Sequence, residues 1–255
     1  MRDPRHFEGL ADEYAAARPP YPPALWDAIR ELGVLQPGRR AVDLGAGTGQ
    51  ATGPLLAAGL SVTAVEPGPR LAAQLRMRHP EATVLISRAE DVELPPESFD
   101  LAVVATAIHW MDLGILLPKL HRALAADGHL LVWRNIFGDT AAPVTPFREQ
   151  VVRIVRDRQA PDDAGTDTED AAATAASLTA SGLFTVADIS RFRWDIELDA
   201  DQVRRLFATF SNWSAEEVDR AASAARDLGG RVVEHYSSWL IVLRPTDAAT
   251  PSPRS

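Results

Sequence analysis

A glycine-rich turn behind a short apolar segment is the feature that most limits what this chain can fold into. The turn lies in the run Val42-Asp43-Leu44-Gly45-Ala46-Gly47-Thr48-Gly49-Gln50. Glycine adopts positive φ angles without strain and lets a backbone approach a ligand closely, and a helix that begins there presents unpaired N–H groups. The dinucleotide-binding pattern is G-x-G-x-x-G, whereas here Gly49 comes one position early. The turn therefore predicts an α/β ligand-binding fold and disfavours a dinucleotide-binding one.

Strand-like and helical segments alternate through the first half of the chain. Short strands are expected at residues 41–44, 61–65, 83–86, 101–105 and 129–133. This alternation is typical of a parallel sheet with crossover helices. The fourth of these segments is apolar throughout, as expected of a strand that is covered on both faces.

The second half is less regular. It predicts a helix at 146–156, a mobile acidic stretch at 157–176, a strand near 185–197, two helices that begin at Asp199 and Ser214, and a last strand at 239–243. Ser214 with Glu217 has the spacing of a capping box. We therefore expect one domain over residues 1–245, with N-terminal helices at about 7–33, a core at 39–135, inserted or lid helices at about 146–182 and 199–228, and a disordered tail at 246–255.

Composition excludes several classes of protein. The chain has 26 Lys and Arg against 35 Asp and Glu, a net charge of −9, and no cysteine. Broad nucleic-acid binding needs clustered cations, and a thiolate metal site needs cysteine. No apolar run reaches the roughly 20 residues that span a bilayer, and the first residues lack a signal-peptide pattern. We expect a cytoplasmic protein with no metal, no nucleic-acid partner and no membrane association.

An acidic residue stands at the end of the second strand. Glu66 follows Val65 and precedes Pro67. At the carboxyl edge of a parallel sheet, a carboxylate in this place can accept hydrogen bonds from both hydroxyls of a ribose. The glycine turn and Glu66 together predict a nucleoside-binding site.

At these residues the chain resembles the class I S-adenosylmethionine-dependent methyltransferases. Three further motifs carry the resemblance: the run from Ala89 to Pro95 followed by Ser98-Phe99-Asp100-Leu101, the element Ala107-Ile108-His109-Trp110-Met111-Asp112, and the N-terminal element with Tyr14, Arg18-Pro19 and Tyr21-Pro22. The last two are similar to elements of the trans-aconitate methyltransferase subgroup. The resemblance covers about residues 7–135 and implies a seven-stranded, mostly parallel, Rossmann-like methyltransferase sheet with helices on both faces and inserted lid helices.

The resemblance also implies the site. Its cofactor-binding residues would be Tyr14, Arg18, Gly45, Ala46, Gly47, Glu66, Pro67, Ala89, Glu90, Thr106, Ala107 and Trp110. The backbone of the glycine turn would face the methionine portion of S-adenosylmethionine, and Glu66 would hold the ribose. Many members of the family carry an acid where this chain has Arg88. An arginine side chain cannot accept a hydrogen bond from the adenine amino group. Adenine recognition therefore depends on Glu90.

His109 is the candidate catalytic residue. It follows the fourth strand on the side expected to face the transferred methyl group, and it could act as a general base for a hydroxyl acceptor. The alternative is that His109 and Trp110 only shape the pocket, because an ionised carboxylate needs no base.

The predicted function is transfer of a methyl group from S-adenosylmethionine to a carboxylate or hydroxyl oxygen of a small molecule, with S-adenosylhomocysteine as the product. The alternatives are a protein that binds the cofactor without transferring methyl (a scaffold or rearrangement catalyst), an N- or C-methyltransferase, and an NAD(P) oxidoreductase. The sequence is compatible with a monomer or a homodimer.

Overall fold

The computed structural model describes residues 17–158, 170–210 and 212–246. Within them, seven strands form one sheet in the order β3-β2-β1-β4-β5-β7-β6. The strands are β1 (Arg40–Leu44), β2 (Ser61–Val65), β3 (Thr83–Leu85), β4 (Phe99–Ala105), β5 (Leu124–Phe137), β6 (Phe184–Asp199) and β7 (Arg231–Pro245). The first five are parallel, and β7 runs antiparallel to both β5 and β6. This sheet confirms the predicted seven-stranded, mostly parallel fold.

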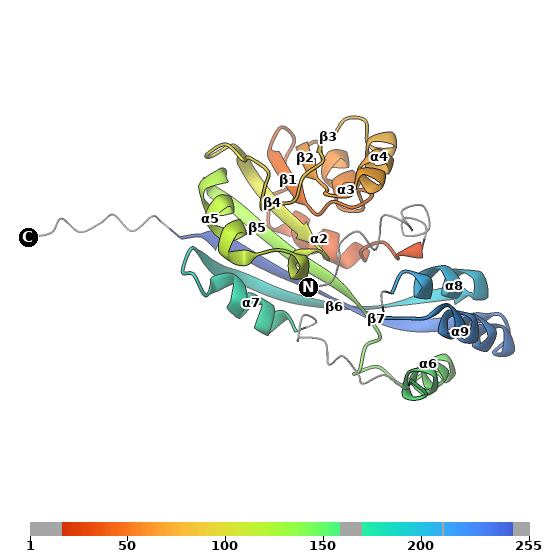
Figure 1. The fold of residues 1–255 in the computed structure, drawn as a ribbon. Coiled ribbons are helices and arrows are strands. Elements are labelled where there is room, and N and C mark those ends of the chain that lie inside the picture. Colours follow the sequence, from red (N-terminus) through yellow and green to blue (C-terminus); the bar gives the residue numbers. More distant parts are fainter. Residues whose placement is uncertain (1–16, 159–169, 211, 247–255) are drawn as a thin grey trace, which may run out of the picture.

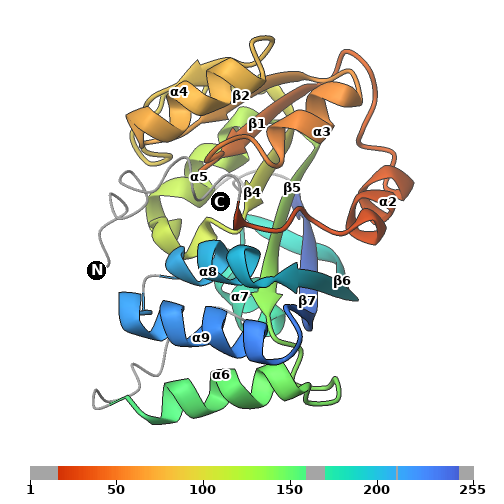
Figure 2. The same cartoon turned by 90° about the vertical axis from the view of Figure 1, so that its right-hand side faces the viewer.

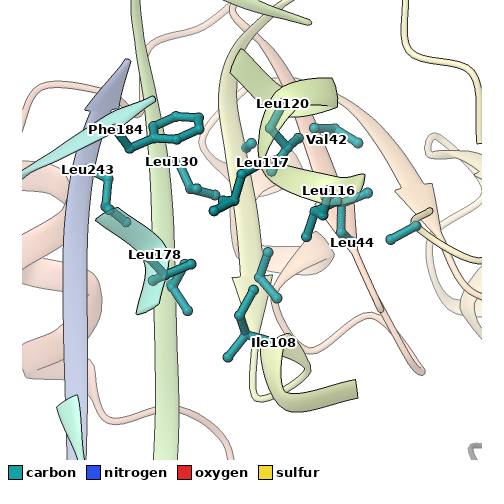
Figure 3. Packing of buried hydrophobic residues seen from close by; sticks show 14 of the residues in the cluster. Val42, Leu44, Ile108, Leu116, Leu117, Leu120, Leu130, Leu178, Phe184 and Leu243 are labelled. Carbon is teal, nitrogen blue, oxygen red and sulfur yellow. The ribbon is translucent and has the colours of Figure 1, made fainter. Parts of the chain in front are cut away.

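Helices cover both faces of the sheet (Figure 1). The helices α2 (Pro23–Glu31), α3 (Thr52–Ala57) and α4 (Pro69–Arg78) lie on one face, and α5 (Leu113–Ala123) and α7 (Ala171–Thr179) lie on the other. Because both faces are covered, the central strand β4 is buried on both sides, with Leu101 to Val104 fully inaccessible to solvent. Figure 3 shows the core on the α5 side, where Leu116, Leu117 and Leu120 pack over Val42 and Leu130.

Three more helices form a separate layer beside the long ends of β6 and β7 (Figure 2). These are α6 (Pro146–Arg156), α8 (Ala200–Ala208) and α9 (Ala215–Asp227), which share an apolar cluster that includes Phe147 and Phe207. The predicted capping box of Ser214 with Glu217 is confirmed, and Asp199 with Gln202 forms a second one at the start of α8. The apolar stripe of α8 is core, as its spacing predicts.

Several element boundaries differ from the sequence prediction. Strand β5 begins at Leu124 and not at residue 129, with a register shift against β4 in place of a simple turn. It also continues to Phe137, and β7 begins at Arg231, because the two strands pair with each other beyond the body of the sheet. The extensions carry Asn135, Phe137 and Tyr236.

Two predictions about irregular segments were wrong. Residues 171–176 belong to helix α7, which Asp170 caps by accepting a hydrogen bond from the Ala172 backbone. Thr246 was assigned to the tail, but its backbone N–H donates to the Leu183 carbonyl at 2.9 Å. Leu32 has the spacing of the buried residues of α2, but it follows the helix and is exposed. Residues 159–169 and 247–255 lie outside the described residues.

Candidate active site

The glycine turn joins β1 to α3 and lies against two neighbouring strands. Gly45 has φ of +69°, and a Cβ atom there would lie 2.6 Å from the Cβ of Ala107, which follows β4. The backbone N–H groups of Gly45 and Ala46 both donate to the Val65 carbonyl at the end of β2. Glycine at position 45 is therefore required both by the backbone angle and by the close approach of the loop after β4.

Glu66 connects the turn to the end of β2. Its side chain is buried, and its Oε2 accepts a hydrogen bond from the Gly47 backbone at 2.8 Å. Its Oε1 accepts another from the Gly68 backbone at 2.8 Å. A carboxylate offers about four lone-pair positions, so each of its oxygens can accept from more than one donor. The arrangement places a negative charge at the carboxyl edge of the sheet, beside the glycine turn.

Asp43 lies beneath the turn and is completely buried. Its Oδ2 accepts a hydrogen bond from the Thr52 hydroxyl, at 2.6 Å, in the first turn of α3. Burial raises the pKa of Asp43 to about 7, and the nearby charge of Glu66 raises it further, while the bonds from Thr52 oppose the rise. Asp43 thus connects the end of β1 to the start of α3, the two elements that the turn joins.

The residues predicted to surround adenine follow β2 and β3. Pro67 is exposed, and Ala89 is buried. The Oε1 of Glu90 accepts a hydrogen bond from the Asp112 backbone at 2.9 Å and lies 3.3 Å from the guanidinium of Arg88. Burial alone would raise the pKa of Glu90, but these partners lower it below the ordinary value. Glu90 therefore connects this loop to the start of α5, and its contact with adenine stays a prediction.

The end of β4 carries an unusual backbone conformation. Thr106 has φ of +60°, in the left-handed region that β-branched residues rarely adopt. Its N–H donates to the Trp133 carbonyl at 2.8 Å, and its Oγ1 lies 3.1 Å from the Tyr21 hydroxyl. Local strain of this kind is concentrated at functional sites. Tyr21 itself is held edge-on against Trp133, with 5.6 Å between the ring centroids.

His109 lies in the 3-10 turn Ile108–Trp110 directly after β4. Its Nδ1 is 3.1 Å from a guanidinium nitrogen of Arg134. Because guanidinium nitrogens only donate hydrogen bonds, Nδ1 accepts this bond, and the proton of the neutral ring is on Nε2. The Trp110 ring lies next to the imidazole, at 4.9 Å between centroids.

A small cavity opens where these elements meet. It is lined by Arg18, Pro19, Tyr21, Gln50, Thr106, Asn135, Phe137 and Tyr236. The guanidinium of Arg18 donates to the Thr209 carbonyl at 3.2 Å and lies over the Phe210 ring, so the end of α8 adjoins the cavity. Of the predicted site residues, Arg18 and Thr106 line this cavity, while Tyr14 lies outside the described residues.

The sequence missed six of the lining residues, including Pro19 of the N-terminal motif. Tyr21 was part of the N-terminal motif but had no assigned role. Asn135 and Phe137 lie on the unexpected extension of β5, and Tyr236 lies on that of β7. Gln50 follows the third glycine of the turn, and its Nε2 donates to the Arg18 carbonyl at 3.0 Å.

A larger open groove lies at the other end of the sheet. Its walls include Arg40, Ser61, Thr83 and Phe99, the first residues of four strands. Ligands of open α/β sheets bind outside the carboxyl ends of the strands, so the small cavity is the better candidate. Within residues 17–158, 170–210 and 212–246, no group of His, Cys, Asp or Glu side chains could hold a metal ion, and no helix is long and apolar enough to cross a membrane.

The family comparison agrees with this geometry. Residues 42–132, which run from β1 to β5, match the model of a methyltransferase domain family. This segment is thus similar to methyltransferase domains, and the sheet that contains it has the Rossmann-like fold of a solved methyltransferase structure.

Individual relatives are more distant. An uncharacterised methyltransferase of Mycobacterium tuberculosis is 38% identical over 130 residues, which cover 51% of this chain and 52% of the relative. The chain thus spans about half the length of the curated relatives that it matches first. A solved structure from Anaeromyxobacter dehalogenans, named as a proposed type II methyltransferase, is 27% identical with a TM-score of 0.56, covering 89% of this chain and 97% of that one.

A second solved structure shares the fold alone. It is phosphoethanolamine N-methyltransferase 2 of Haemonchus contortus, in complex with phosphomonomethylethanolamine and S-adenosylhomocysteine. The identity is 17% and the TM-score 0.56, with coverage of 95% of this chain and 58% of that one.

Proposed function

We propose that this chain transfers a methyl group from S-adenosylmethionine to an oxygen of a small-molecule acceptor. The observation that carries the proposal is the pairing of Glu66 with Gly47 at the carboxyl edge of the sheet, inside the segment that matches a methyltransferase domain. Such a pairing sets a ribose-binding carboxylate beside a backbone turn that a ligand can approach closely.

The residues present fit the proposed cofactor. A Cβ atom at Gly45 would lie 2.6 Å from the Cβ of Ala107, so the turn needs a bare backbone, and Glu66 places a carboxylate directly beside Gly47. The cavity formed by Arg18, Tyr21 and Thr106 adjoins the turn through Gln50 and offers a place for the reacting end of the cofactor.

For methyl transfer, the protein mainly has to position the two reactants. When bound, S-adenosylmethionine supplies an activated methyl group on a sulfonium leaving group. The backbone of the turn and Glu66 would orient the nucleoside, and the loop after β4 would hold the acceptor in line. The end of α8 would exclude water. Such positioning can lower a barrier by about 7–11 kcal/mol.

The acceptor is proposed to be a small molecule. The cavity is narrow, and the net charge of −9 opposes a polyanionic partner. The resemblance of the Ala107–Asp112 and Arg18-Pro19 elements to trans-aconitate methyltransferases suggests a carboxylate acceptor. Cofactor binding without methyl transfer, and methylation of nitrogen or carbon, remain the rival functions.

His109 is proposed to orient the acceptor or to act as its base. The contact with Arg134 favours the orienting role, because Nδ1 already accepts this bond and is the basic nitrogen of the neutral ring. The substitution His109→Asn keeps an acceptor for Arg134 but removes any base. We expect kcat to stay within about threefold of wild type if the role is orientation. A loss of about 100-fold or more, the usual size of a general-base contribution, with unchanged cofactor affinity would assign the base role.

The proposal is tested with S-adenosylmethionine labelled with ¹³C in the transferred methyl. The protein is incubated with small carboxylates, phenols and amines, and S-adenosylhomocysteine formation is measured together with the carbon chemical shift of the product. We expect acceptor-dependent turnover to an O-methyl product, and release of methanol by base would identify an ester. Cofactor binding without turnover on any acceptor would favour the non-transferring rival, and an N-methyl or C-methyl product would contradict the oxygen assignment.

A further inference from the structure

A hydrogen-bond relay fixes the orientation of one side chain on the cavity wall. The indole Nε1 of Trp194 donates to Ser238 Oγ at 2.9 Å, and Ser238 Oγ is 2.7 Å from Asn135 Oδ1. Indole N–H is only a donor, so Ser238 accepts from Trp194 and gives its own proton to Asn135. Ser238 is buried, which makes a broken relay costly. The amide oxygen of Asn135 is therefore fixed against Ser238.

This relay leaves the amide nitrogen of Asn135 as a donor. Asn135 lines the cavity, and its Nδ2 makes no hydrogen bond within the described part of the chain. If the amide rotated, Nδ2 would replace Oδ1 against Ser238, and the proton of this buried hydroxyl would lose the acceptor that it has in the structure, which conflicts with its burial. Because the amide cannot turn without that conflict, the cavity wall has a donor in place before any ligand arrives.

A second donor stands next to it on β7. The ring of Tyr236 stacks on Trp194 with 4.7 Å between centroids and meets Phe137 edge-on at 5.4 Å. Tyr236 lines the cavity, and its hydroxyl has no hydrogen-bond partner among the residues that the structure describes. Burial raises the pKa of Tyr236 well above its ordinary value, so the hydroxyl keeps its proton.

The charge of the wall favours an electron-rich group. Arg18 is cationic, and no carboxylate is found among the described lining residues. The nearby buried acid, Glu234, is ion-paired with Arg148, whose guanidinium lies over the Phe137 ring. An ammonium group would therefore meet donors and a like charge, whereas a carboxylate or carbonyl oxygen would meet partners.

The two donors also lie on the side of the sheet that is away from the proposed nucleoside site. The glycine turn and Glu66 follow β1 and β2, whereas Asn135 and Tyr236 belong to β5 and β7, beyond β4. We therefore propose that Asn135 Nδ2 and the Tyr236 hydroxyl bind a carboxylate or carbonyl oxygen of the methyl acceptor, with Trp194 and Ser238 as positioning residues. This inference rests on the proposed function, whose acceptor it describes.

The composition of the chain allows a direct test. Asn135 and the exposed Asn212 are its only asparagines, so ¹⁵N-asparagine labelling gives two side-chain amide pairs in an NMR spectrum. Sodium acetate is titrated into the protein with and without S-adenosylhomocysteine, and methylammonium chloride is titrated at equal ionic strength. We expect acetate to shift the Asn135 pair saturably, while Asn212 stays unchanged and methylammonium has no effect. An Asn135 pair that ignores acetate, or responds equally to both salts, would overturn the proposal.

Variants test the relay. We expect Ser238→Ala to weaken acetate binding about fivefold, the equivalent of one neutral hydrogen bond, and Ser237→Ala, on the opposite face of β7, to leave it unchanged. Trp194→Phe keeps the aromatic ring against Tyr236 but removes the N–H, so it should also weaken binding in a protein with an intact core. Equal effects of Ser238→Ala and Ser237→Ala, or none from Trp194→Phe, would contradict the positioning role.

Cofactor affinity separates this inference from the proposed function. Asn135→Leu should leave the affinity for S-adenosylhomocysteine within about twofold of wild type in calorimetry. A tenfold loss would assign Asn135 to the cofactor and overturn the inference while the proposed function stands. A wild-type protein that responds to acetate at Asn135 but binds no S-adenosylhomocysteine would instead overturn the proposed function.

Discussion

At the scale of single residues, Glu66 holds the glycine turn in place and is also the proposed ribose-binding residue. Both of its oxygens accept backbone N–H bonds, so Glu66→Gln would turn an amide NH₂ toward either Gly47 or Gly68. We expect this variant to lose about tenfold or more in affinity for S-adenosylhomocysteine, since bonds to charged groups contribute about 1.5–3 kcal/mol. Calorimetry measures the affinity, and thermal unfolding reports the folded state. The exposed Glu93→Gln is the control, and equal affinities in both variants would remove Glu66 from the site.

Asp43 makes a separate prediction about stability and pH. Its folded pKa of about 7 lies above the value of an unfolded aspartate, near 4. A raised acid pKa means that the folded state holds the proton more tightly. The stabilisation is thus fully present below about pH 4 and is lost as the pH rises to about 7, by on the order of 4 kcal/mol. Asp43→Asn keeps an acceptor for Thr52 without ionising.

We therefore expect the free energy of unfolding of Asp43→Asn, relative to wild type, to increase between pH 4 and pH 7 and then to level off. Urea unfolding across this range measures the difference. The exposed Asp91→Asn should show no such trend. A constant difference between Asp43→Asn and wild type would mean that Asp43 is ionised throughout this range.

At the scale of elements, the glycine turn depends on its fit against the loop after β4. Gly45→Ala would combine a positive φ with a Cβ 2.6 Å from that of Ala107. We expect a loss of about 2–4 kcal/mol in the free energy of unfolding. Gly182→Ala is a matched control, because Gly182 has φ of +71° and nothing within 4 Å of its Cβ position. It should show the backbone effect alone, about 1 kcal/mol.

The double variant Gly45→Ala with Ala107→Gly removes the opposing methyl group. We expect it to recover most of the difference between Gly45→Ala and Gly182→Ala, as measured by urea unfolding. If both single glycine variants lose the same stability, the close packing of the turn against Ala107 is not what requires glycine at position 45.

Some helices and strands could be predicted from the sequence, and others could not. The turn, Glu66 and the parallel strands carry local signals, because glycine spacing and short apolar runs are visible in the chain itself. The extension of β5 to Phe137 carries none, since it forms only through antiparallel pairing with β7, about 100 residues away. Asn135 and Tyr236 were therefore missed. The first part of α7 was assigned to the mobile stretch because the buried stripe of this helix is made of Ala171, Ala175 and Leu178, of which two are small.

At the scale of the whole molecule, the sheet order separates two tasks. The turn and Glu66 lie on the β1–β2 side, the donors of the cavity wall lie on the β5–β7 side, and the strained end of β4 stands between them. The helices α6, α8 and α9 pack on the second side only (Figure 2). Changes in that layer can thus alter the proposed acceptor pocket while the proposed nucleoside site keeps its framework.

This division predicts the response of the folded state to ligands. A ligand at about 100 times its Kd stabilises a protein by roughly 2.7 kcal/mol, which for a chain of this size is a shift of about 5–10 °C in Tm. We expect S-adenosylmethionine and S-adenosylhomocysteine to raise Tm, and NADP to leave it unchanged, because the third glycine is displaced from the dinucleotide pattern. Phe210→Leu, in the acceptor-side layer, should respond to both sulfur nucleosides as wild type does. A shift with NADP alone would mean that the turn binds a dinucleotide, and the assignments of Glu66 and the turn to S-adenosylmethionine would be wrong.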